Sequence, residues 1–295
     1  MQNYRIFGKN KVEIVIEMGL GSCLSEWLPI AKQLGEEYGV MVYERAGVNK
    51  SSIPEERRTP HNIAVELYNL LKQVEHREKI ILLAHSQGGL YAQQFCRLYP
   101  DLVKGIILLD PLSAKDYVFK EKLTKKEYRK SGVDKSQIFR IMRTFAKLRL
   151  GGLTKKLLRN APPFYYYNEY SPKEIKEILD CADSPVHAST VLEEYICAHE
   201  PEQIKGLLEK NNFPDIPLIL ITHSSDMAIE ENMKFGGNSR AFAEKIERMW
   251  QGIMKEYLAY SNNSKWIQAK KSTHYIHLQE PDLIKTALNM VEEAV

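Results

Sequence analysis

The sequence has few of the features that mark a secreted scaffold, a metal protein or a membrane protein. It contains four cysteines in 295 residues, with no C-x-x-C pair and no histidine group near them at zinc spacing. No apolar run approaches the roughly 18 residues of a membrane span, and the N-terminus lacks an apolar signal region. We therefore expect a cytoplasmic protein with reduced cysteines and no transmembrane segment.

Neither sign of charge dominates the whole chain. The formal net charge is +3, which gives no reason to expect a nucleic-acid partner. The charge is uneven, however, because Lys115–Arg159 carries fifteen Lys and Arg against four Asp and Glu. Within it, 137–149 has apolar residues at helical spacing between cations. We expect a helix packed by its apolar face with solvated cations outside, and the alternative is a surface for lipid or anionic substrates.

Short apolar runs alternate with longer helical patterns along much of the chain. Such runs, four to five residues long and mostly apolar, are typical of buried parallel strands, and the first of them is broken only by Glu13. The helical pattern 63–74 has its apolar residues on one face, and 90–98 and 283–291 are similar. The sequence thus predicts an α/β fold with a mostly parallel sheet covered by helices on both faces, and residues 4–7 could add an antiparallel edge strand. The predicted core strands are 12–16, 40–43, 80–84, 106–109 and 218–222.

The alternation stops after Asp110-Pro111 and resumes near Pro217. Between these points the sequence shows helical patterns and no convincing strand. We therefore predict a core formed by residues 1–112 and 213–295, with a helical insert at 113–212. The insert includes an aromatic cluster at 162–170, which could line an apolar ligand pocket or form the insert's own small core.

The strongest chemical signal is the run from Ile80 to Leu90, an apolar strand that leads through a tight turn into a helix. Ser86 lies at the tip of the turn, with Ala84 and Gly88 two places before and after it. A nucleophile elbow needs small residues at these two positions, because its backbone is sharply bent. We predict that Ser86 is a nucleophile and that the backbone N–H of Gln87 is one oxyanion donor.

Two further segments supply the groups that an activated serine needs. The glycine-containing loop after the first core strand, Gly19-Leu20-Gly21, can bring the N–H of Leu20 close to the nucleophile as the second oxyanion donor. Near the C-terminus, His274 and His277 compete for the role of general base. Residues 264–271 can form the last strand and His274 is the first histidine after it, so we assign the base to His274 and expect His277 to pack beneath the loop.

The acid of the triad has two candidates, both at strand ends between Ser86 and His274. Asp226 follows the strand 218–222, and Asp110 follows the strand 106–109. Chain order in this class of site is Ser, then Asp or Glu, then His, which both satisfy. We assign Asp226 to orient His274, with Asp110 as the competitor.

These motifs together resemble the α/β-hydrolase family over nearly the whole chain. Besides the elbow, the resemblance includes three further segments: Tyr43-Glu44-Arg45-Ala46-Gly47, Leu108-Leu109-Asp110-Pro111, and Ser272 to Pro281 around His274. It implies that the helical insert 113–212 is a lid over the active site. It also argues against epoxide or haloalkane chemistry, for which the elbow residue would be Asp.

The expected activity is hydrolysis of a small-molecule ester with an apolar acyl or aryl group, through an acyl-enzyme on Ser86, without metal or organic cofactor. An amide or aminopeptidase activity is the alternative, and it would need carboxylates in the lid to bind an α-amine. Further alternatives are a lipase that acts at a lipid surface and a non-catalytic binding protein on the same fold. The oligomeric state is left open, and the possible amine anchors are Glu193, Glu194 and Glu200.

Overall fold

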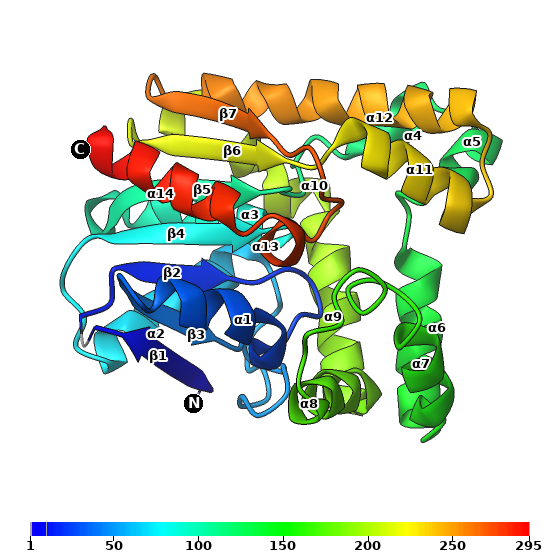
Figure 1. The fold of residues 1–295 in the computed structure, drawn as a ribbon, viewed down its shortest axis with the longest axis horizontal. Coiled ribbons are helices and arrows are strands. Elements are labelled where there is room, and N and C mark those ends of the chain that lie inside the picture. Colours follow the sequence, from blue (N-terminus) through cyan, green and yellow to red (C-terminus); the bar gives the residue numbers. More distant parts are fainter. Residues whose placement is uncertain (1, 10, 295) are drawn as a thin grey trace.

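The computed structural model describes residues 2–9 and 11–294. Its centre is a seven-stranded sheet in the order β1-β3-β2-β4-β5-β6-β7, parallel except for β1, which runs antiparallel to β3 at one edge (Figure 1). The predicted α/β class and mostly parallel sheet are thus confirmed. The strands are β1 Tyr4–Gly8, β2 Ile14–Glu17, β3 Gly39–Tyr43, β4 Ile80–His85, β5 Val103–Leu109, β6 Leu218–Thr222 and β7 Ser264–Gln268.

Successive residues of the central strands point alternately into two separate apolar layers. In β4, Leu82 and Ala84 belong to the layer that contains α2, α3 and α12, whereas Ile81 and Leu83 face the layer that contains α1 and α14. This alternation follows from the two-residue period of a strand, and it explains why the strands are apolar throughout. The covering helices are α1 Leu24–Leu34, α2 Pro60–Gln73, α3 Gly88–Leu98, α12 Arg240–Lys255 and α14 Asp282–Glu293.

The chain between β5 and β6 contains helices, and no strand is found among its described residues. Because β5 and β6 are adjacent and parallel, this excursion leaves the sheet at the carboxyl end of β5 and returns to the amino end of β6. Its elements are α4 Tyr117–Lys122, α5 Lys125–Lys130, α6 Ser136–Lys147, α7 Gly151–Leu158, α8 Pro172–Asp183, α9 Pro185–Ala198, α10 Pro201–Ile204, η2 Lys205–Leu208 and η3 Lys210–Asn212. The remaining short elements are η1 Pro100–Leu102, α11 Ser225–Gly236, η4 Glu256–Ala259 and α13 Ile276–Gln279.

The excursion is tied to the sheet core by specific side chains. In Figure 1, α9 lies next to the carboxyl ends of the strands, and α6 and α7 lie beyond it at the edge of the molecule. The Tyr170 hydroxyl donates to the carbonyl of Glu26 at 3.1 Å, and the Tyr166 hydroxyl donates to Glu231 at 2.6 Å. The aromatic cluster therefore joins the insert to α1 and α11. In the described part of the chain, none of the helices is long and apolar enough to cross a membrane.

Candidate active site

Ser86 occupies a strained turn between β4 and α3. Its φ of 53° is in the left-handed region that non-glycine residues rarely adopt, and such strain is common where a side chain must be presented for chemistry. The backbone is held there because the Ser86 N–H donates to the carbonyl of Leu109 at 3.0 Å, while its own carbonyl accepts from Leu112 at 2.8 Å. The turn thus has the backbone form of the predicted nucleophile elbow.

Two glycines allow other backbone segments to approach this turn. A Cβ on Gly88 would overlap the carbonyl oxygens of Glu17 and Met18, so the start of α3 can pack against the end of β2 only without a side chain. A Cβ on Gly19 would lie 3.2 Å from the Ser86 Cβ, which puts the β2–α1 loop beside the serine. Among the described residues, the N–H groups of Leu20 and Gln87 donate to no protein acceptor. Their role as oxyanion donors stays a prediction.

His274 lies in the loop between β7 and α13, and its Nδ1–H donates to Oδ2 of Asp110 at 2.6 Å. This leaves Nε2 as the ring nitrogen with a free lone pair, which is the form a general base requires. The loop is anchored to the core, because the buried ring of His85 donates a hydrogen bond from Nε2 to the backbone carbonyl of His274 at 2.9 Å. The His274 side chain is 36% exposed, so its outer edge can meet a substrate.

The structure corrects the choice of Asp226 as the carboxylate that orients His274. The residue that directly follows β6 is His223, and Ser224 then caps α11 by accepting the N–H of Met227 at 3.5 Å. Asp226 therefore falls in the first turn of that helix, where its side chain is exposed. Asp110 is instead 3% exposed at the end of β5 and reaches His274 directly.

Sequence reasoning missed His223 and Glu247, which face Asp110 from the other side. His223 donates its backbone N–H and its Nδ1–H to Asp110, both at 2.9 Å, and its Nε2–H donates to Glu247 at 2.9 Å. The His223 ring also stacks on Trp250. The only sequence signal was a histidine at the position where an acid was expected, and Glu247 lies on α12, with no local motif to link the two.

The charges of this cluster follow from these contacts. Burial lowers the pKa of His223, but the charges and hydrogen bonds of Asp110 and Glu247 outweigh burial and raise it to about 10. Burial would raise the pKa of Asp110, but the charge of His223 and the hydrogen bonds from His223 and His274 hold it well below its usual range. Asp110 is thus a carboxylate, and His223 an imidazolium, across the neutral pH range.

His277 occupies the packing position expected for it. Its ring is 1% exposed and stacks on Trp27 with centroids 3.9 Å apart, and neither ring nitrogen has a hydrogen-bond partner among the described residues. Burial, followed by the nearby His85 and His274, keeps its pKa well below the usual value, so it stays neutral. The ring is therefore neutral and enclosed, as expected for a histidine that packs beneath the loop.

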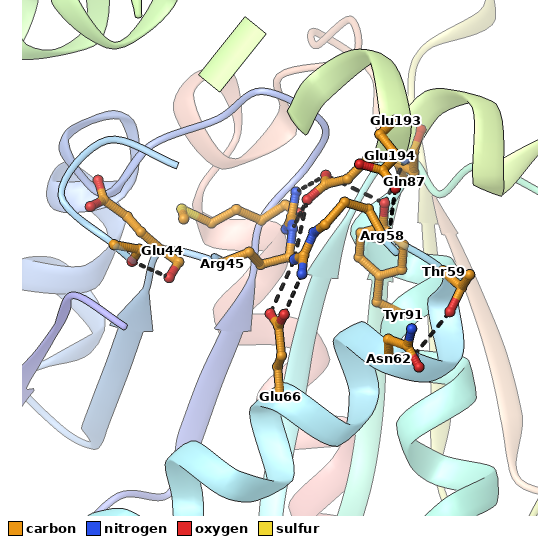
Figure 2. A network of polar contacts seen from close by, with 12 residues as sticks. Glu44, Arg45, Arg58, Thr59, Asn62, Glu66, Gln87, Tyr91, Glu193 and Glu194 are labelled. Carbon is orange, nitrogen blue, oxygen red and sulfur yellow. Dashed lines mark hydrogen bonds and ion pairs between the residues drawn. The ribbon is translucent and has the colours of Figure 1, made fainter. Parts of the chain in front are cut away.

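A second polar cluster is sealed beneath the β2–α1 loop and centres on Arg45, which follows β3. Its guanidinium donates to Glu17 at 2.8 Å, to Glu194 of α9 at 2.8 and 3.0 Å, and to the carbonyls of Met18 and Gly19 at 2.6 and 3.0 Å. Figure 2 shows Arg45 and Arg58 both turned toward Glu194. Arg45 therefore holds the loop that leads to Leu20 and connects it to the insert.

The three carboxylates considered as amine anchors already have partners. Glu194 is 1% exposed, and although burial would raise its pKa, Arg45 and Arg58 lower it below the usual value. Glu200 pairs with Arg57 at 3.0 Å, and Glu193 accepts the backbone N–H of Arg58 at 3.4 Å. Glu194, the buried one, is committed to the arginines and would have to be released before it could bind a substrate amine.

A surface cavity of about 620 Å³ lies between α1, the aromatic cluster and α13. Tyr166 and Tyr167 line it, so part of the aromatic cluster does wall a hollow. Its lining does not include Ser86, Asp110 or His274, and we do not assign it to the acyl group.

Comparison with known proteins supports the fold. A family model described as "alpha/beta hydrolase fold" matches residues 14–133. The protein YqjL of Bacillus subtilis is 26% identical over 286 residues, which cover 95% of this chain and 83% of YqjL. Proline iminopeptidase of Saccharolobus solfataricus is 31% identical over 120 residues, 40% of this chain and 39% of the peptidase. A thermophilic esterase from Thermogutta terrifontis superimposes with a TM-score of 0.65 at 15% identity, over 99% of this chain and 93% of the esterase.

These similarities agree with the mostly parallel sheet flanked by helices. The family model over residues 14–133 and the structural neighbours are consistent with the α/β-hydrolase superfamily, which is the family that the motifs resemble. The fold of this chain is that of hydrolytic enzymes.

Proposed function

We propose that this protein is a serine hydrolase that cleaves a carboxylic ester through an acyl-enzyme on Ser86. The observation that carries the proposal is the 2.6 Å hydrogen bond from His274 Nδ1 to the buried Asp110 carboxylate. That bond fixes the tautomer in which Nε2 can accept a proton, and the strained turn at Ser86 presents a hydroxyl for it to activate.

In the proposed first half-reaction, Nε2 of His274 takes the Ser86 proton as Oγ attacks the ester carbonyl carbon. The carbonyl oxygen becomes an oxyanion, which accepts hydrogen bonds from the N–H groups of Leu20 and Gln87. The tetrahedral intermediate expels the alkoxide, which takes the proton from His274. Water then attacks the acyl-enzyme with the same base, and the carboxylic acid leaves while Ser86 regains its proton.

We expect this site to cleave esters more readily than amides, because an alkoxide leaves more readily than an amine. The amide alternative has support from the relative named proline iminopeptidase, but it would also need an anchor for the α-amine. Of the three candidate anchors, Glu194 is enclosed by arginines, and Glu193 and Glu200 are already hydrogen-bonded. We therefore favour esters with an apolar acyl or aryl group.

The deciding experiment combines covalent capture with turnover. Intact mass is measured after incubation with a fluorophosphonate, on the wild type, on Ser86→Ala and on Ser189→Ala, which changes a partly exposed serine of α9. We expect one adduct on the wild type and on Ser189→Ala, and none on Ser86→Ala. The wild type and both variants are then assayed on p-nitrophenyl esters of graded acyl length and on p-nitroanilides.

Each outcome bears on a different part of the proposal. Ester turnover that disappears with Ser86→Ala supports it as a whole. Anilide turnover without ester turnover would keep the activated serine but overturn the ester assignment. A folded wild type that neither forms an adduct nor turns over any substrate would overturn the enzyme in favour of a binding protein.

A further inference from the structure

The helices α6 and α7 expose an unusual amount of apolar surface. Six of the twelve exposed large hydrophobic side chains in the described residues belong to this short stretch. On each helix the exposed members recur at helical spacing, so they lie on one side of it. We name these six residues the outer face: Ile138, Ile141, Leu148, Leu150, Leu153 and Leu157, which are 43 to 71% exposed.

The outer face is not the packing side of these helices. The buried residues of the two helices are instead Ala146, Gly151 and Thr154, and α6 packs on α9 while α7 packs on α8. The expectation that the apolar residues of 137–149 would pack inward is therefore wrong for Ile138, Ile141 and Leu148. An exposed apolar patch of this kind on a folded protein usually marks an interaction site.

Charge around the outer face identifies what could cover it. From Lys135 to Arg159 the chain has eight Lys and Arg and no Asp or Glu. Lys155 pairs with Asp180 and Asp183 of α8, whereas the other seven cations form no ion pair with the described residues. The surface is therefore apolar and strongly cationic, which is the composition of a helix that lies in the interface of an anionic bilayer.

A second copy of the chain fits this surface poorly. A symmetric dimer through the outer face would bring two sets of seven unpaired cations together, and like charges in contact oppose association. We propose that the outer face docks on an anionic phospholipid surface, with its leucines and isoleucines among the acyl chains and its cations at the headgroups. This inference is independent of the proposed esterase activity.

The test uses full-length Ser86→Ala protein, so that hydrolysis cannot alter the vesicles. Co-sedimentation is measured with vesicles of phosphatidylcholine alone and of phosphatidylcholine with phosphatidylserine. We expect binding only to the anionic vesicles. Binding should weaken between about 0.1 M and about 1 M salt, because the Debye length falls from about 10 Å to about 3 Å.

Matched pairs of variants locate the docking surface. Leu157→Ser and Ile53→Ser each remove one apolar side chain of almost equal exposure, 71% and 69%. We expect Leu157→Ser to lose about tenfold in vesicle affinity and Ile53→Ser to lose none. The charge pair compares Arg140→Ser with Arg149→Ser against Arg240→Ser with Arg248→Ser on α12. The first double variant should lose about 25-fold, or about fivefold per cation, and the second should bind as the parent does.

Three results would overturn the proposal. The first is an absence of binding to anionic vesicles, which would leave an acidic protein as the partner for this face. The second is equal losses from the outer-face and control variants. The third is sedimentation velocity that shows a dimer of the parent and a monomer of Leu157→Ser, since a second copy would then cover the outer face.

Discussion

Two fully enclosed carboxylates, Asp110 after β5 and Glu17 at the end of β2, differ in their protonation. Asp110 receives hydrogen bonds from two histidines, and its pKa lies well below the usual range. Burial raises the pKa of Glu17 to about 7, because the opposing effects of Arg45 and Tyr43 are only partial and Glu194 adds a second negative charge. Burial alone therefore does not decide the charge of a carboxylate.

The difference comes from how many cations each carboxylate must share. Asp110 faces the imidazolium of His223 and also accepts from His274, whereas Glu17 shares the guanidinium of Arg45 with Glu194. A carboxylate that stays ionised can stabilise the imidazolium that would form on His274 in the proposed reaction. Glu17 instead has the contacts of a structural group, since its partner Arg45 also binds the carbonyls of Met18 and Gly19.

The largest expected effect is on kcat, and it distinguishes Asp110 from Asp226, the two sequence candidates for the acid that orients His274. Asp110→Asn should lower kcat on a p-nitrophenyl ester by about 10⁴-fold, because an amide cannot hold His274 in the required tautomer or stabilise its charged form. Asp226→Asn removes a carboxylate from the exposed first turn of α11 and should leave kcat within about twofold. Steady-state kinetics on the two variants measure the contrast.

Circular dichroism of both variants serves as the folding control. If Asp226→Asn proved the more damaging of the two while both remained folded, the hydrogen bond between His274 and Asp110 would not be the functional one.

The second prediction concerns stability at the Glu17 cluster. A raised folded-state pKa means that, between pH 4.5 and about 7, the unfolded chain releases the Glu17 proton while the folded chain keeps it. The contribution of Glu17 to stability is therefore fully present below pH 4.5 and declines as the pH rises to about 7. Glu17→Gln mimics the protonated form and lacks this decline. Between pH 5 and pH 8, the variant should gain about 2 kcal/mol in unfolding free energy relative to the wild type.

Urea unfolding across this pH range measures the difference, with Glu56→Gln at an exposed position as the matched control. A constant difference between Glu17→Gln and the wild type would mean that Glu17 is already ionised in the folded protein at pH 5. In that case Arg45 would be a stronger partner than the comparison with Asp110 implies.

Most of the fold could be predicted from local sequence, because buried parallel strands are continuous apolar runs. All five predicted core strands correspond to strands of the sheet, and the antiparallel edge strand is present at β1. The strand that precedes His274 is less apolar, since β7 lies at the sheet edge, and it could be recognised only by its position before the histidine. The direction in which the apolar residues of α6 face was not predictable, because helical spacing identifies a face but not what covers it.

Site residues that directly follow a strand could be predicted from the sequence. Site residues that are brought together by contacts between distant elements could not. Ser86 and Asp110 come immediately after β4 and β5, and the backbone fixes where their side chains lie. Asp226 is three residues further from β6 than His223, and the start of α11 turns it outward. Neither the strand pattern nor the chain order of a triad predicts the contact between His223 and Glu247, because it joins a strand end to a distant helix.

The smallest expected effect tests the charge of His223, on which the low pKa of Asp110 depends. His223→Asn retains a short side-chain donor toward Asp110 but removes the positive charge and the contact with Glu247. The full negative charge of Asp110 then acts on His274 alone. We expect the acidic limb of the kcat/KM profile to move up by about one pH unit, with a smaller change at the plateau.

Two comparisons separate this electrostatic effect from a simple loss of packing. Glu247→Gln keeps the imidazole, its stacking on Trp250 and its contacts with Asp110, so it should leave the acidic limb closer to that of the wild type than His223→Asn does. Trp250→Leu removes the stacking and leaves both carboxylates in place, so it should affect stability more than the pH profile. An unchanged acidic limb in His223→Asn would mean that His223 is neutral in the working enzyme. Asp110 would then resemble Glu17 more closely, and the contrast between the two buried carboxylates would rest on His274 alone.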